Sequence, residues 1–114
     1  MPARKIPQPP AHLRPATADW WRSVMADFDL EAHHVLLLTA AAEALDRATE
    51  ARGLLAAEGL TVPTGNGGCK PHPAAGIERD NKTLFARLLR ELDLDVGGPA
   101  PDARPPALRS NRRL

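Results

Sequence analysis

One cysteine and four histidines are the residues of this sequence that could bind a metal. Cys69 and His72 have a spacing found among zinc ligands, and His33 and His34 could complete a set of four. Adjacent helical residues point about 100° apart, so His33 and His34 are poorly placed to bind one ion together. The pattern predicts no metal site and places both histidines in a helix's polar first turn. Stoichiometric zinc lost on Cys69→Ala would instead indicate a small metal-dependent enzyme.

The glycine-rich stretch TGNGGCK at 64–70 has the composition of a phosphate-binding loop. A P-loop carries Ser or Thr directly after its lysine, whereas Pro71 follows Lys70 here. No strand, loop and helix of a nucleotide-binding sheet surround the stretch. The sequence therefore predicts a turn and no nucleotide cofactor.

Acidic residues could hold a divalent cation only if they converge. Four of those on the longest predicted helix are spread over about four turns: Glu43, Asp46, Glu50 and Glu58. Glu43 and Arg47 are spaced for an ion pair, while Asp46 and Glu50 are like charges that repel mildly unless a basic group approaches. The only serines are Ser23 and Ser110, and neither lies in a nucleophile motif. We therefore expect no enzymatic activity and no cofactor.

Trp20 and Trp21 could stack on nucleic-acid bases or on other side chains. Base stacking normally accompanies a basic groove, and only Arg22 is adjacent. Trp21 also shares a helical face with Val24 and Met25, whereas Trp20 lies about 100° away. We predict a packing role for the pair, in which Trp20 widens the apolar stripe or contacts a neighbour.

The elements that position these residues are helical, so the predicted fold class is all-α. A short helix is predicted over 15–26, a long helix over 31–58, and a C-terminal helix over 73–92. Pro15 and Pro73 suit first helical positions, and Gly59 is a natural stop. Residues 60–72 are predicted to form a short hairpin or an irregular loop.

The long helix spans about 42 Å, more than a core of this size covers. Its apolar positions alternate in steps of three and four, and small residues among them permit close helix approach. We therefore expect a protruding rod that contacts a second subunit through Leu38, Ala41, Leu45, Ala48 and Leu55. In the C-terminal helix, Glu78 and Lys82 are spaced for an ion pair.

Charge divides the chain into three parts, although the net charge is only +1. Residues 1–14 carry +3, the predicted helical core 15–96 carries −5, and residues 97–114 carry +3. Nine of the twelve prolines fall within 1–15 and 97–114, which predicts two flexible basic arms around one helical domain. Such arms suit contact with a polyanion, or alternatively only solvation.

Nothing in the sequence indicates a membrane or an oxidising compartment. No stretch approaches the roughly 20 apolar residues of a membrane span, and the basic N-terminal stretch lacks the apolar region of a signal peptide. A single cysteine cannot form an internal disulfide. We therefore expect a cytoplasmic protein without a membrane partner.

Four stretches carry a family resemblance over most of 9–95. They read PPAHLRPATADWW at 9–21, LEAHHVLLLTAAAEALDRA at 30–48, EGLTV followed by KPHPAAGIERD within 58–80, and FARLLRELDLD at 85–95. Together they resemble the small subunit of tailed-bacteriophage terminases, in its short all-helical branch. Two positions depart from the pattern: Arg14 stands at a helix N-cap where a Ser-like residue is expected, and the loop 63–69 is rich in glycine.

The resemblance implies a non-enzymatic factor that forms a homo-oligomeric ring and binds double-stranded viral DNA at the packaging site. It also implies recruitment and regulation of the large terminase subunit, an ATPase and nuclease, in the cytoplasm of the bacterial host. Candidate DNA contacts are Arg4, Lys5, Arg14, Arg22, Lys70, Arg79 and Lys82. Candidate docking residues for the large subunit are Leu108, Arg109, Arg112, Arg113 and Leu114. The alternative is a helical homo-oligomeric protein–protein adaptor that does not bind DNA.

Overall fold

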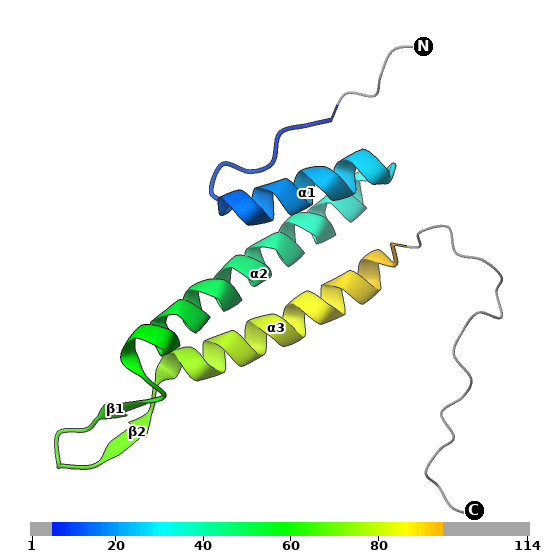
Figure 1. Ribbon diagram of the computed structural model, residues 1–114. Coiled ribbons are helices and arrows are strands. Elements are labelled where there is room, and N and C mark those ends of the chain that lie inside the picture. The colour runs from blue at the N-terminus through cyan, green and yellow to red at the C-terminus, as the bar shows by residue number, and fades with distance from the viewer. Residues whose placement is uncertain (1–5, 95–114) are drawn as a thin grey trace, which may run out of the picture.

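The computed structural model describes residues 6–94, which form three helices and one small hairpin (Figure 1). The elements in chain order are α1 (Pro15–Asp27), α2 (Ala32–Glu58), β1 (Thr61–Pro63), β2 (Cys69–Pro71) and α3 (Pro73–Leu92). This order confirms the predicted all-α fold class and places each helix boundary within one residue of its predicted position. Residues 1–5 of the predicted N-terminal arm and the whole predicted C-terminal arm, 97–114, lie outside the described residues.

The prolines and glycines define the element boundaries as expected. Pro15 and Pro73 open α1 and α3, where the missing N–H costs no hydrogen bond. Gly59 ends α2 with a φ of 89°, a conformation that glycine adopts without a steric penalty. Of the two predicted alternatives for 60–72, the structure has the hairpin, in which Val62 pairs with Lys70 in antiparallel register.

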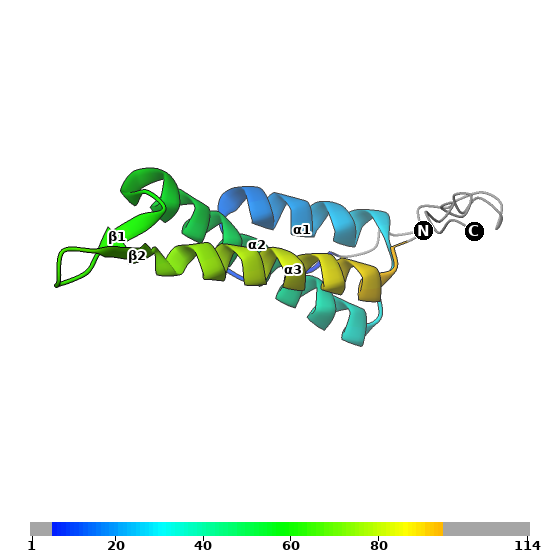
Figure 2. The same ribbon diagram turned by 90° about the horizontal axis from the view of Figure 1, so that it is seen from below.

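Helix α3 runs back along α2, and the two helices form the main layer of the molecule (Figure 1 and Figure 2). Small side chains line their contact and allow the backbones to approach closely. Those of Ala44, Ala48 and Ala51 on α2 and of Ala74 on α3 are all buried. The predicted protruding rod is therefore wrong, because α3 of the same chain covers it.

The predicted subunit contact on α2 is corrected for the same reason. Leu38 and Ala41 are completely buried within the chain, and Ala48 and Leu55 are almost so. A side chain already buried by its own chain offers no surface to a neighbouring subunit. Leu45 alone of the five keeps partial exposure, and it lines a shallow groove of about 170 Å³ between α2 and α3.

Helix α1 packs against the first half of α2 and reaches across to α3. Its predicted stripe is buried at Trp21, Val24 and Met25, together with Leu38 of α2 and Leu92 of α3. Trp20 lies beside this stripe and contacts Phe85 of α3, with ring centroids 5.6 Å apart and planes tilted by 60°. Both tryptophans therefore have a packing role, and Trp20 joins α1 to α3.

A residue of α2 supplies hydrogen-bond acceptors to donors at the N-terminus of α1. Arg14 occupies the N-cap without a side-chain cap, as its type predicts. Asp46 supplies the acceptors instead: one carboxylate oxygen lies 3.0 Å from the backbone N–H of Arg14, and the other accepts from the Thr17 hydroxyl at 2.6 Å. Asp46 is only 1% exposed, so its carboxylate faces these donors rather than solvent.

Candidate nucleic-acid interface

The basic residues predicted to contact DNA lie on three separate elements. Arg14 and Arg22 are on or next to α1, Lys70 is on β2, and α3 carries Arg79 and Lys82. All five are exposed. Arg4 and Lys5 lie outside the described residues. The structure thus does not gather the predicted residues into one patch.

Helix α3 instead presents a basic face made of Arg79, Arg87 and Arg90. Ala74 and Leu92 mark the buried side of this helix. At about 100° per residue, the three arginines lie about 140–160° around the helix from that side. All three are exposed. The basic face therefore points away from the core and toward solvent.

Ion pairing differs between the candidates. Arg22 pairs with Asp19 at 2.8 Å, Arg79 with Asp80 at 3.1 Å, and Lys82 with Glu78 at 3.0 Å, which confirms the predicted spacing of the last pair. Within residues 6–94, Arg87 and Arg90 have no carboxylate within ion-pair distance. These two arginines are thus the least neutralised charges of the basic face.

Sequence reasoning missed Arg87 and Arg90, although both stand in the stretch FARLLRELDLD. The amphipathic pattern of that stretch could have indicated that these two arginines are exposed. Leu88, Leu89 and Leu92 turn toward the core, so the arginines between them must turn outward. Helical phase, rather than the mere presence of basic residues, would have identified this face.

The acidic side chains of α2 also have partners other than those expected. Glu43 pairs with His12 at 2.8 Å rather than with Arg47. Arg47 pairs instead with Glu50, at 3.3 Å. These contacts leave no convergent set of carboxylates along α2 among the described residues.

The structure rules out the four-ligand zinc set considered from sequence. His33 and His34 stand at the beginning of α2, whereas Cys69 and His72 follow its end, and 27 residues of helix span about 40 Å. Both ring nitrogens of His72 are engaged: Nδ1 accepts from the backbone N–H of Ala74 at 2.9 Å, and Nε2 lies 2.7 Å from Glu58. His72 is therefore the N-cap of α3.

The prediction that His33 and His34 are poorly placed together is wrong. Their ring centroids are 4.1 Å apart, because side-chain rotation brings together rings whose Cβ atoms diverge. One ligand atom from each, with one from Glu31, lies within 4.8 Å of the others. The three side chains are exposed or half-buried at the beginning of α2.

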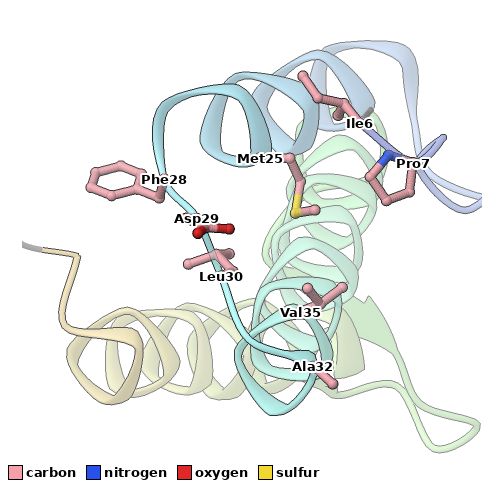
Figure 3. Close-up of a pocket in the computed structure, with 8 residues that line it drawn as sticks. All are labelled: Ile6, Pro7, Met25, Phe28, Asp29, Leu30, Ala32 and Val35. Carbon is pink, nitrogen blue, oxygen red and sulfur yellow. The ribbon is translucent and has the colours of Figure 1, made fainter. Parts of the chain in front are cut away.

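A cleft of about 230 Å³, lined mostly by residues of apolar type, opens where α1 leads into α2 (Figure 3). We call it the α1–α2 cleft. Its lining comes from the stretch before α1, the end of α1 and the beginning of α2, and consists of Ile6, Pro7, Met25, Phe28, Asp29, Leu30, Ala32 and Val35. The described chain thus begins in the wall of this cleft.

Large apolar side chains also remain exposed on the α2–α3 pair. Ile77 and Leu84 are 47% and 43% exposed, and Leu54 is 47% exposed. Ile77 and Leu84 are seven residues apart, which places them on one side of α3. That side lies about 80–100° around the helix from Phe85, the residue that meets Trp20. No described element covers these side chains.

Comparison of the chain with models of protein families, with curated proteins and with solved structures gives no match. Among residues 6–94, none of the helices combines the length and the apolar character that crossing a bilayer requires.

Proposed function

We propose that this chain is a small terminase subunit. In this proposal it forms a homo-oligomeric ring in the cytoplasm of the bacterial host and binds double-stranded viral DNA at the packaging site. It recruits and regulates the large subunit, and residues 108–114, outside the described part, are the docking segment. The sequence resemblance supports the family, and the basic face of α3 supports the DNA contact.

The basic face of α3 is the observation that carries the DNA-binding proposal. Arginine guanidinium groups on the exposed side of a rigid helix can contact successive phosphates, which position a protein on DNA without reading its sequence. Arg87 and Arg90 have no described acidic partner to displace before such contact. The basic stretch with Arg4 and Lys5 would add contacts of the same kind.

Replacing Arg87 and Arg90 with alanine should weaken binding of the full chain to duplex DNA and reduce its salt dependence. Each lost phosphate contact lowers the slope of log affinity against log salt by about 0.9, so the double variant should lose about 1.8. Fluorescence anisotropy with labelled duplex across a salt series measures both quantities.

The matched control is the double variant Arg22→Ala/Arg47→Ala, which removes two exposed arginines already paired with Asp19 and Glu50. It should lower the slope by less than the α3 variant. Equal slopes for the two variants would contradict a specific role for α3. A wild-type chain without affinity at low salt would favour the protein–protein adaptor instead.

Self-association is proposed to use the exposed apolar side of α3 and not the buried residues of α2. Ile77→Glu/Leu84→Glu should shift the molar mass in solution toward that of a single chain, because two charges would be buried in the subunit contact. Light scattering after size exclusion measures the mass. Leu60→Glu, at a residue 68% exposed beside the hairpin, is the control and should leave the mass unchanged. A monomeric wild-type chain would contradict this part of the proposal.

A further inference from the structure

We propose that the α1–α2 cleft is an intramolecular docking site for the basic residues that precede Ile6. Arg4 and Lys5 lie against an acidic rim formed by Asp27, Asp29 and Glu31. The cleft thus competes with DNA for these two residues. The docking itself stands on the cleft and its charge; the competition rests in addition on the proposed DNA-binding function.

The lining of the cleft combines apolar side chains with one carboxylate. Met25, Phe28 and Val35 are among its apolar lining residues, while Asp29 brings a carboxylate to its edge (Figure 3). Ile6 and Pro7 already line the opposite side, so a segment of this chain is in place there. The proposed occupant is therefore joined directly to a residue of the cleft wall.

The charge of the rim is opposite to that of the proposed occupant. Asp27 is the last residue of α1, Asp29 lies in the connection, and Glu31 is the N-cap of α2; all three are exposed. The last turn of α1 has no basic residue, so the partial negative charge of its carbonyl end adds to the carboxylates. The charged groups nearby also include His33, whose Nδ1 is 3.8 Å from Glu31.

Chain connectivity compensates for the weakness of exposed ion pairs. A single exposed pair contributes only about 0.2–1 kcal/mol. Successive Cα atoms are about 3.8 Å apart, so Lys5 and Arg4 start within about 8 Å of Ile6. A tether this short gives the charges a high effective concentration at the rim. The contact is therefore populated, yet DNA phosphates can displace it.

The first test measures backbone order in the full chain by ¹⁵N relaxation at low salt. Docking predicts order parameters for Arg4 and Lys5 above about 0.6, the value below which backbone is flexible. Neutralising the rim with Asp27→Asn/Asp29→Asn/Glu31→Gln should bring both below that value. The control is Glu43→Gln/Glu50→Gln/Glu58→Gln, which removes three acids of α2 that lie away from the cleft and are not paired with a candidate DNA contact; it should leave both order parameters unchanged.

Three outcomes of the first test would overturn the docking. One is a low backbone order parameter at both residues in the wild-type chain. Another is an equal loss of backbone order at these residues in the rim and control variants. The third is order that rises with protein concentration, which would assign the segment to a second copy. None of these readouts involves DNA, so the docking can fail while the proposed function stands.

The second test measures competition with duplex DNA by anisotropy. The rim variant should bind DNA more tightly than the control variant, which has the same net charge. That advantage should disappear when Arg4→Ala/Lys5→Ala is added to both, because no basic segment is then released. An advantage that persists without Arg4 and Lys5 would overturn the competition. Absence of DNA binding in every variant would instead contradict the proposed function.

Discussion

Replacing Trp21 with alanine is expected to lower the free energy of unfolding by about 3–5 kcal/mol. Trp21 is 2% exposed and lies at the centre of the cluster that holds α1 against α2 and α3. The expected loss of stability has two sources: the apolar surface of the ring is no longer buried, and its removal leaves a cavity in the core. Because small domains are stabilised by only about 5–15 kcal/mol, this one change should remove a large part of the total. Chemical denaturation followed by far-UV circular dichroism measures it.

Trp21→Phe is the matched control. It keeps an aromatic ring in the core but removes the hydrogen bond that the indole N–H donates to the Thr39 hydroxyl at 3.2 Å. A typical hydrogen bond contributes about 1 kcal/mol, so the phenylalanine variant should be clearly more stable than the alanine variant. A loss below about 1 kcal/mol for Trp21→Ala would mean that α1 is not docked as described.

Replacing Asp46 with alanine is expected to cost about 2–4 kcal/mol of unfolding free energy. Two donors would lose their acceptor, the backbone N–H of Arg14 and the hydroxyl of Thr17. Thr17 is itself buried, at 5% exposure, so water cannot easily replace the carboxylate. Denaturation of the full chain measures the cost. Asp46→Asn, which keeps one acceptor oxygen, should lose less.

A double-mutant cycle with Thr17→Val separates this contact from the general cost of altering the core. Once the hydroxyl is gone, part of the penalty of Asp46→Ala disappears, so the double variant should lose less than the sum of the single losses. Contacting residues typically couple by about 0.5–3 kcal/mol. Additive losses would show that the 2.6 Å contact between these side chains contributes no stability.

The helices could be predicted because their signals are local. Pro15, Pro73 and Gly59 restrict the backbone at the element boundaries wherever the rest of the chain lies. The pairing of Glu78 with Lys82 was predictable for the same reason, since both lie on one helix. The hairpin was one of two alternatives, and pairing across its loop decided between them.

The features that sequence reasoning missed depend on contacts between distant segments. Asp46 is a charged residue, a type that usually lies on the surface, and its burial follows only from the position of α1. Ala41 and Ala48 were predicted to contact a second subunit, whereas both are buried within the chain; the pattern cannot tell whether the neighbour is the same chain or another. Of the candidate site, the exposure of Arg79 was predictable from helical phase, whereas the dispersal of the other candidates over three elements was not.

The capping of α1 by Asp46 sets an order in which the chain can fold. During synthesis α1 leaves the ribosome before α2, but the acceptor for its first turn lies 32 residues later in the sequence. A helix of 13 residues is marginal in water without such support. Formation of α2 should therefore precede stable α1, although α1 is synthesised earlier than α2.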